Sequence, residues 1–340
     1  MKVLVLGGSG YVGARLCALL RDSGWATALC ASSRQPAPGV NGLRVDTRDP
    51  AALRRALAGV DAVVNCVAGS ASAIGQGAAL LTQAALAAGC RRLVHLSSMA
   101  VYGPAEGRLD ESCPLDGSLG WYAAAKVEAE EHVAAFAAQG GAAVVLRPGC
   151  VWGPGSALWV ERIARLLQAG RLGDLGAAGD GWSNLVHVDD VCQAVLAALR
   201  GTDARPGVRS YNLAAPDSPR WNEYFVDLAL AIGATPVRRL PPLQLRLDAL
   251  LAGPPLKLLE LAARRLPGSA RRLPVVMPPN LLGLWERQLQ LDATRATREL
   301  DLQWTAYQTA LQQSAAWFLQ QQRRGRRGMP APLQGSDSPT

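Results

Sequence analysis

Lysine and histidine are scarce in this chain, and its cysteines stand alone. Only Lys2, Lys126 and Lys257 are lysines among 35 basic residues, and the rest are arginine. Three histidines and seven scattered cysteines form neither a CxxC pair nor a histidine cluster. This pattern disfavours both a zinc site and a secreted disulfide framework. We therefore expect a cytoplasmic protein with reduced thiols and no bound metal.

Long apolar runs are also missing. No segment reaches the ~18–20 uncharged apolar residues that a membrane helix needs. The N-terminal segment 1–7 is too short and too soon glycine-rich for a signal peptide, so we expect no membrane span. With 340 residues, 49% hydrophobic and 18% charged, the chain has a globular composition. It is long enough for one α/β domain with an appended lobe.

The formal net charge of +8 raises the question of a nucleic-acid partner. Most arginines are dispersed along the chain, and the one cluster, Arg323, Arg324, Arg326 and Arg327, lies near its end. We interpret this distribution as a solvated basic surface rather than a specific polyanion site. The expected partner is a small-molecule substrate, without specific nucleic-acid binding, and a homodimer is an open alternative to a monomer.

Short apolar segments alternate with helical ones through the first 150 residues. Asp49 and Pro50 are typical of a helix cap and a first helical position. The alternation predicts a Rossmann-type α/β fold, in which helices cover both faces of a doubly wound parallel sheet. Predicted strands span 2–6, 26–31, 43–45, 61–67, 92–96 and 142–146, and predicted helices span 12–20, 50–58, 78–88 and 121–138.

After about residue 150 the pattern loosens, which predicts a smaller, mostly C-terminal substrate lobe. Residues 1–235 would hold the Rossmann domain and the first part of this lobe. Residues 236–322 would complete the lobe, and residues 323–340 would be a disordered tail. Predicted helices span 159–168, 188–199, 221–232 and 306–322, with a leucine- and proline-rich segment at 240–267 and a turn at 274–279.

Glycines fill the segment that follows the first predicted strand and opens the first predicted helix. It reads Gly7-Gly8-Ser9-Gly10-Tyr11-Val12-Gly13 and fits both GxGxxG and GxxGxxG. Such a loop lets backbone amides approach a pyrophosphate at the positive end of a helix. The alternative is a plain glycine turn, but the position between strand and helix favours a dinucleotide site that includes Gly7, Gly10, Tyr11, Val12 and Gly13.

No carboxylate follows the second predicted strand, where NAD-selective sites place one to bind the ribose. The chain has Ser32, Ser33 and Arg34 there instead. An arginine and two hydroxyls can bind a 2′-phosphate that a carboxylate would repel. The sequence therefore favours NADP(H) over NAD(H), although Arg34 could also be an ordinary surface residue. Asp46, after the next strand, could accept a hydrogen bond from adenine.

Tyr122 and Lys126 are spaced by four residues and share one face of a predicted helix. A nearby ammonium lowers the pKa of a phenol, which lets tyrosine exchange a proton with a carbonyl or alkoxide near neutral pH. Ser98 follows a predicted strand at the sheet edge where ligands bind. The pair could arise by chance, but the glycine loop and the segment Ser97–Gly103 in the same order make a catalytic set more specific.

With these motifs the chain resembles the extended short-chain dehydrogenase/reductase family, which includes nucleotide-sugar epimerases, dehydratases and carbonyl reductases. Further segments that match are Asp110-Glu111, 147–154 (RPGCVWGP), 186–191 (VHVDDV) and Tyr211-Asn212-Leu213. The resemblance covers roughly residues 1–235. It implies that Ser98, Tyr122 and Lys126 are catalytic, that Lys126 also binds the nicotinamide ribose, and that Ala68 and Pro148 lie near the nicotinamide.

Two further residues have a structural and a functional interpretation. His187 matches a strand-to-helix segment, so a packed, hydrogen-bonded histidine is favoured over a catalytic one. Cys150 could line the substrate cleft, but a buried small side chain is the preferred interpretation.

Three functions remain open. The first is an NADP(H)-dependent oxidoreductase that acts on a small, uncharged carbonyl or secondary alcohol. The second is a nucleotide-sugar epimerase or dehydratase with retained NAD, and the third is a non-catalytic dinucleotide-binding sensor. A nucleotide sugar needs a cation for its diphosphate, and none is present at Gly149-Cys150 or at residues 183–185. Trp285 suits an apolar cleft, which also favours an uncharged substrate. Arginines of the C-terminal lobe are the counter-evidence: Arg264, Arg265, Arg271 and Arg272.

Overall fold

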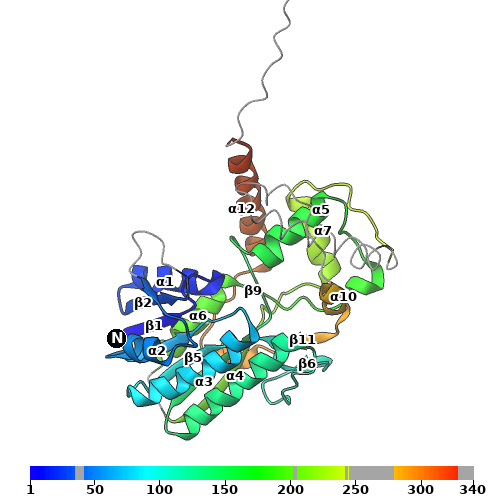
Figure 1. The fold of residues 1–340 in the computed structure, drawn as a ribbon. Coiled ribbons are helices and arrows are strands. Elements are labelled where there is room, and N and C mark those ends of the chain that lie inside the picture. Colours follow the sequence, from blue (N-terminus) through cyan, green and yellow to red (C-terminus); the bar gives the residue numbers. More distant parts are fainter. Residues whose placement is uncertain (35–41, 202–204, 242–243, 245–278, 328–340) are drawn as a thin grey trace, which may run out of the picture.

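The computed structural model describes residues 1–34, 42–201, 205–241, 244 and 279–327. Its centre is a seven-stranded, all-parallel sheet in the order β10-β7-β5-β4-β1-β2-β3 (Figure 1). This confirms the predicted doubly wound parallel sheet. The strands are β1 (Lys2–Leu6), β2 (Thr27–Ser32), β3 (Gly42–Arg44), β4 (Ala62–Asn65), β5 (Arg92–Leu96), β7 (Ala142–Pro148) and β10 (Gly207–Leu213).

Helices cover both faces of this sheet. Alternate residues of β1 show why: Val3 and Val5 pack on one side, and Leu4 and Leu6 pack on the other. A strand buried on both faces needs apolar residues at consecutive positions. One face carries α1 (Tyr11–Ser23), α6 (Val188–Arg200) and α11 (Thr294–Glu299), and the other carries α2 (Pro50–Leu57), α3 (Ala71–Ala87) and α4 (Trp121–Ala138).

The strand order changes direction beside β1. From β1 the chain adds β2 and β3 on one side, then crosses over to place β4 on the other side of β1. Crevices at such a switch point, outside the carboxyl ends of the strands, are where open parallel sheets bind ligands. The glycine loop lies at this point, because it directly follows β1.

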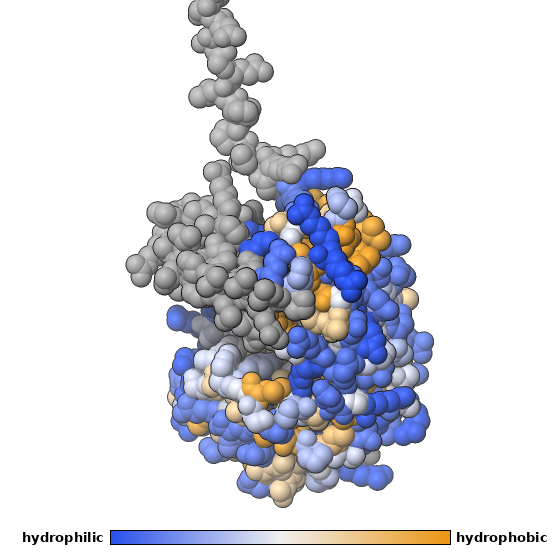
Figure 2. All heavy atoms as spheres, turned by 90° about the vertical axis from the view of Figure 1, so that its right-hand side faces the viewer, coloured by the Kyte–Doolittle hydropathy of each residue, from blue (hydrophilic) through white to orange (hydrophobic). Residues whose placement is uncertain are grey.

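A smaller lobe packs beside the sheet, on the right of Figure 1. Its core is aromatic: Trp221 stacks on Phe225 with ring centroids 5.7 Å apart, and Phe225 meets Trp285 edge-on at 5.1 Å. Figure 2 shows this side of the molecule, where most of the coloured surface is hydrophilic and hydrophobic residues gather in patches. The lobe contains α5 (Arg162–Gln168), α7 (Trp221–Ala231), α10 (Pro279–Glu286) and α12 (Tyr307–Arg327).

Two pairs of three-residue strands join the lobe to the main domain. No local sequence pattern predicts them, because each strand is short and its partner is remote in the chain. They are β8 (Cys150–Trp152) with β9 (Leu185–His187), and β6 (Gly107–Leu109) with β11 (Leu289–Leu291).

Several predicted boundaries need correction. Helix α3 begins at Ala71, seven residues before the predicted start, because Ser70 caps it by accepting a hydrogen bond from Ala73 N at 3.3 Å. A π-helical turn over Ala157–Glu161 precedes α5, which begins at Arg162 rather than at residue 159. The segments predicted at 240–267 and 274–279 lie mostly outside the described residues.

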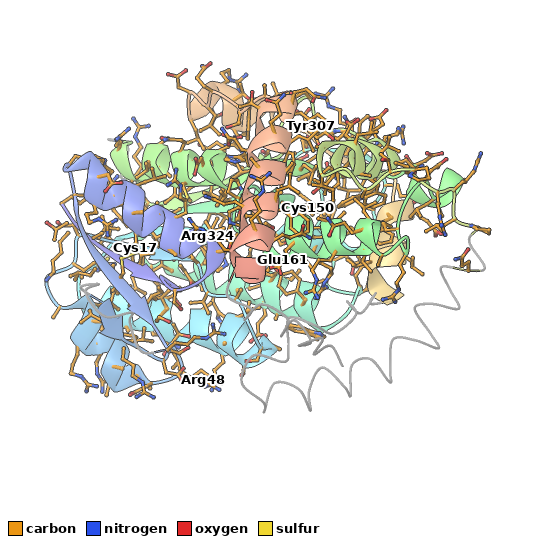
Figure 3. All side chains as sticks on the ribbon, turned by 90° about the horizontal axis from the view of Figure 1, so that it is seen from above. Cys17, Arg48, Cys150, Glu161, Tyr307 and Arg324 are labelled. Atoms are coloured by element: carbon orange, nitrogen blue, oxygen red, sulfur yellow. A yellow bond between two sulfur atoms is a disulfide. The ribbon has the colours of Figure 1, made fainter. Side chains whose placement is uncertain are left out.

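The predicted tail also starts too early. Helix α12 continues to Arg327, so residues 323–327 are helical, and Figure 3 shows Arg324 on this helix. Glutamine and arginine are good helix formers, so nothing in residues 320–324 ends the helix. Residues 328–340 lie outside the described part of the chain.

Cys17 of α1 and Cys30 of β2 form a disulfide with their Cα atoms 6.2 Å apart. The expectation that all thiols are reduced is therefore wrong for this pair. Because α1 runs back along the neighbouring strand, two cysteines 13 residues apart come to face each other. Within the described residues, no helix combines the length and apolarity needed to cross a membrane, and no three potential metal ligands gather.

Candidate active site

A cavity of about 1270 Å³ opens at the carboxyl ends of the central strands. Figure 3 shows two of its lining residues: Arg48 lies at an edge of the molecule near α2, and Cys150 lies near the middle. The cavity brings together every residue that the sequence assigned to catalysis or to cofactor binding. These are Gly7, Gly10, Tyr11, Val12, Gly13, Ser32, Ser33, Arg34, Asp46, Ala68, Ser98, Tyr122, Lys126 and Pro148.

The glycine loop leaves space for a ligand against the first turn of α1. Gly7 has a φ of +78°, and Gly10 N donates a hydrogen bond to Gly7 O at 2.9 Å. A Cβ at Gly13 would lie 2.2 Å from Gly7 O, so a larger residue would push loop and helix apart. The close approach keeps the unpaired N–H groups of the helix start facing the cavity. This geometry fits a dinucleotide pyrophosphate.

Hydroxyls and arginines surround the far end of the cavity beside β2 and β3. Ser9 Oγ and Ser32 Oγ lie 2.6 Å apart, and Arg34 N donates to Ser32 Oγ at 3.1 Å. The side chains of Ser33 and Arg34 are exposed there. Sequence reasoning missed Ser9, although it lies inside the glycine loop.

Arg48, which was not predicted from the sequence either, forms an ion pair with Asp46 and lowers its pKa. Its guanidinium donates to both carboxylate oxygens at 3.0 and 2.7 Å, and its backbone N donates at 2.9 Å. These hydrogen bonds lower the pKa of Asp46 to about 2. The carboxylate is therefore charged but paired, which reduces its repulsion of an anionic ligand at this end of the cavity.

Ser98, Tyr122 and Lys126 converge on the middle of the cavity. Ser98 lies two residues after β5, and its Oγ accepts a hydrogen bond from Ala100 N at 3.2 Å. Tyr122 and Lys126 lie in the first two turns of α4. Lys126 is only 3% exposed, and its Nζ donates to Leu96 O at 2.7 Å. Burial lowers the pKa of Lys126 to about 8.

The expected lowering of the Tyr122 pKa by Lys126 is not found. Burial instead raises the pKa of the phenol, while hydrogen bonding to Ser98 opposes the rise. The physical reason is the position of the ammonium, which is held on Leu96 O and lies 6.0 Å from the ring centroid of Tyr122. In this state Tyr122 is a protonated group, which suits a proton donor.

A buried ion pair fixes α4 against the sheet. Arg147 at the end of β7 donates to Glu130 Oε2 from Nη2 at 2.7 Å, and both side chains are 6% exposed. Arg147 Nη1 also donates to Tyr102 Oη at 3.0 Å, and this hydroxyl donates to Asn212 Oδ1 at 2.6 Å. Because Glu130 lies one turn beyond Lys126, the network positions the helix that carries Tyr122 and Lys126.

The opposite end of the cavity belongs to the smaller lobe, and sequence reasoning missed all of it. Its residues come from segments that meet only in the folded chain, so no local pattern marks them. The wall is mainly apolar, with three charged side chains. It includes Pro104, Glu106, Leu119, Leu158, Trp159, Arg162, Leu281, Gly283, Leu284 and Arg287.

Trp285 does not belong to this wall. It is fully buried in the aromatic core of the lobe, so its assignment to the cleft was wrong. Asn184 is also structural, since it donates to Leu289 O at 2.8 Å and accepts from Leu291 N at 2.8 Å. Arg264, Arg265, Arg271 and Arg272 lie outside the described residues.

His187 follows its structural interpretation, whereas Cys150 is both a buried small side chain and part of the cavity lining. His187 is 4% exposed and caps α6, with Nδ1 accepting from Asp189 N at 3.3 Å. Cys150 is 1% exposed and lines the cavity, but burial strongly raises the pKa of its thiol. A neutral thiol is a poor nucleophile.

The chain is similar to known proteins in both sequence and fold. A model of the NAD dependent epimerase/dehydratase family matches residues 3–214. The chain belongs to this family. A 2-alkyl-3-oxoalkanoate reductase from Stenotrophomonas maltophilia is 34% identical over 256 residues, which cover 69% of this chain and 76% of that protein. A 2'-dehydrokanamycin reductase from Streptomyces kanamyceticus is 31% identical over 248 residues, or 68% and 67% of the two chains.

Solved structures of the epimerase/dehydratase type share the fold. A dTDP-glucose 4,6-dehydratase double mutant from Streptomyces venezuelae, solved with NAD, aligns with a TM-score of 0.70 and 22% identity. The alignment covers 95% of this chain and 98% of that one. Family membership and the reductase relatives make this epimerase/dehydratase family protein an enzyme, an oxidoreductase of the short-chain dehydrogenase/reductase type.

Proposed function

We propose that this enzyme is an NADP(H)-dependent reductase of a small keto compound. The observation that carries the proposal is the convergence of Ser98, Tyr122 and Lys126 on the cavity that also holds the glycine loop. Relatives named as reductases of 2-alkyl-3-oxoalkanoates and of 2'-dehydrokanamycin support a carbonyl substrate. A cytoplasmic location stays a prediction, as does a homodimer.

When bound, NADPH supplies the hydride that reduces a carbonyl carbon. The glycine loop would hold its pyrophosphate, Lys126 would hold its ribose hydroxyls, and Ala68 and Pro148 would lie at the nicotinamide end. Tyr122 donates the proton that the carbonyl oxygen needs, which leaves a phenolate that takes up a proton from solvent. Ser98 donates a hydrogen bond to the same oxygen and so orients it.

Cofactor preference is the first prediction. Arg34 and the paired Asp46–Arg48 carboxylate favour a 2′-phosphate at the end of the cavity beside β2. Charge-assisted contacts of this kind contribute about 1.5–3 kcal/mol, so NADPH should bind about ten- to a hundredfold more tightly than NADH. Isothermal titration calorimetry with both cofactors measures the ratio. Equal affinities in the wild type, or an unchanged ratio in Arg34→Glu, would show that the proposed phosphate site is wrong.

Lys126 should serve both binding and chemistry. Lys126→Met is expected to weaken NADPH binding and to lower turnover together, because the ammonium is assigned to both roles. In the wild type, reduction should slow as the pH rises through about 8, where Lys126 loses its charge. Tyr122 stays protonated over that range, since its pKa is raised. A pH profile that keeps its inflection near 8 in Lys126→Met would assign the titration to another group.

The second candidate function is a nucleotide-sugar epimerase or dehydratase with retained NAD. The fold favours it, because the structural neighbours include such enzymes. We expect UDP- and dTDP-sugars to bind weakly, and a thermal-shift screen with NADPH present tests this. A ligand at about a hundred times its dissociation constant adds about 2.7 kcal/mol. A large shift with a nucleotide sugar and none with keto compounds would favour the second function.

A non-catalytic sensor is the least supported alternative. A sensor has no need of proton-transfer residues, yet Ser98, Tyr122 and Lys126 all line the cavity. The expectation of an uncharged substrate rested on segments 149–150 and 183–185, which offer no cation. Arg287, however, is a cation that lines the cavity.

A further inference from the structure

Arg287 is a fixed cation at the substrate end of the cavity. Its backbone is held from both sides, because Trp182 N donates to Arg287 O at 3.1 Å and Arg287 N donates to Leu284 O at 3.3 Å. Its side chain is held as well, since Nη2 donates to Gly103 O. Gly103 closes the loop that begins at Ser98, so the guanidinium is tied to the loop that carries a candidate catalytic residue.

Within the described part of the chain, no close carboxylate balances the charge of Arg287. The residue is partly buried, and burial lowers its pKa, an effect that the more distant carboxylate of Glu106 opposes. Among the residues that the structure describes, no carboxylate oxygen lies within 4.0 Å of its guanidinium nitrogens. By contrast, Arg147 has Glu130 and Arg48 has Asp46 as ion-pair partners.

A partly buried guanidinium has five N–H donors and loses favourable hydration unless acceptors replace water. The contact with Gly103 O uses one of these groups, and Arg287 lines the cavity. Because Arg287 lines the cavity, a ligand there can replace water as the acceptor for its remaining N–H groups. An anionic group of the substrate meets this requirement.

The neighbouring side chains narrow the kind of anion. Glu106 and Arg162 line the same end of the cavity. The negative charge of Glu106 opposes a diphosphate with two negative charges more than a carboxylate with one, although Arg162 adds a second positive charge to this wall. A single carboxylate matches the planar fork of one guanidinium and its single charge. Leu158, Leu281 and Leu284 lie on the same wall and suit a hydrocarbon chain.

We propose that Arg287 binds a carboxylate of the substrate, so that the enzyme reduces the keto group of a hydrocarbon-bearing keto acid. This inference rests on the proposed function, because it places the keto group beside Tyr122 and the acid group at Arg287. It replaces the expectation of an uncharged substrate. Arg287 is a specificity-determining residue in this account and takes no part in proton transfer.

The test compares three substrates with NADPH: a 2-alkyl-3-oxoalkanoate, its methyl ester, and the ketone formed by loss of its carboxylate. The wild type should prefer the acid, in kcat/KM, by about ten- to a hundredfold over the ester. Arg287→Met should abolish most of this acid-to-ester ratio through a higher KM for the acid, and Arg287→Lys should restore part of it. Arg21→Met, which removes an exposed arginine of α1 that does not line the cavity, should leave the ratio unchanged.

The possible outcomes separate this inference from the proposed function. If the wild type reduces the ester or the ketone as well as the acid, the carboxylate subsite is wrong, although the reductase function stands. If no keto compound is reduced with NADPH, the proposed function itself fails. UDP-glucose binding that is lost in Arg287→Met would assign the arginine to a diphosphate and also overturn the proposal. If Arg287→Met fails to fold, the acid-to-ester ratios of the wild type and of Arg287→Lys still test whether Arg287 binds the carboxylate.

Discussion

Turnover of the Tyr122→Phe variant should fall by roughly two to four orders of magnitude, because the change removes the proton donor and keeps the ring. Trp121 contacts this ring edge-on with centroids 5.8 Å apart, and phenylalanine preserves that contact. Affinity for NADPH should stay near the wild-type value. Single-turnover kinetics with saturating NADPH and a keto substrate measure the chemical step directly.

Tyr211→Phe provides a matched control. Tyr211 does not line the cavity, and its hydroxyl donates to Glu299 Oε2 at 3.0 Å. Loss of this hydroxyl should leave turnover within a few-fold of the wild type. If Tyr122→Phe keeps most of its activity, or if Tyr211→Phe loses as much, then Tyr122 is not the proton donor.

Removing one partner of the buried Glu130–Arg147 pair should lower the free energy of unfolding far more than removing one partner of an exposed ion pair. Glu130→Ala leaves the guanidinium of Arg147 buried without its counter-charge, at a site where the Arg147 side chain is 6% exposed. Such a change costs about 3–5 kcal/mol, whereas the intact pair itself adds little over a well-packed apolar pair. Urea unfolding followed by tryptophan fluorescence measures the loss, and a double variant, Glu130→Leu with Arg147→Met, should recover much of it.

An exposed ion pair supplies the comparison. Glu161, labelled in Figure 3, pairs with Arg165 at 3.9 Å and is 45% exposed in its side chain. Glu161→Ala should change the free energy of unfolding by at most about 1 kcal/mol. If Glu130→Ala is no more destabilising than Glu161→Ala, the buried network does not fix α4.

Local patterns were enough to predict most of the main domain. The strands beside the glycine loop are consecutive apolar residues, and α4 begins and ends where its apolar and alanine-rich segment does, at Trp121 and Ala138. The dinucleotide residues were accessible for the same reason, since Gly7 to Gly13 are contiguous. Tyr122 and Lys126 are one helical turn apart, so their shared face follows from helix geometry.

Features that depend on distant segments could not be predicted in this way. Arg287 reaches the cavity only because α10 and β11 dock beside the loop after β5, 184 residues earlier in the chain. Trp285, two residues before it, faces the aromatic core instead. The sequence alone does not predict that Arg287 lines the cavity and that Trp285 is buried, because both positions depend on how the smaller lobe packs.

The charge state of the site residues also could not be predicted from the sequence alone. The spacing of Tyr122 and Lys126 suggested a lowered phenol pKa, but the hydrogen bond from Lys126 to Leu96 O holds the ammonium away. Likewise, Asp46 was considered a free acceptor, whereas Arg48 pairs with it. Such effects depend on atomic positions that residue spacing alone does not give.

The most direct test of the account is the fate of the hydride. With NADPH deuterated at the transferred position of the nicotinamide ring and a 2-alkyl-3-oxoalkanoate, mass spectrometry measures deuterium in the product while absorbance measures NADPH. The account predicts that one NADPH is consumed for each hydroxyl formed, with one deuterium on the new carbinol carbon. Turnover of a nucleotide sugar without net consumption of cofactor, together with no deuterated hydroxy acid from the keto acid, would contradict it.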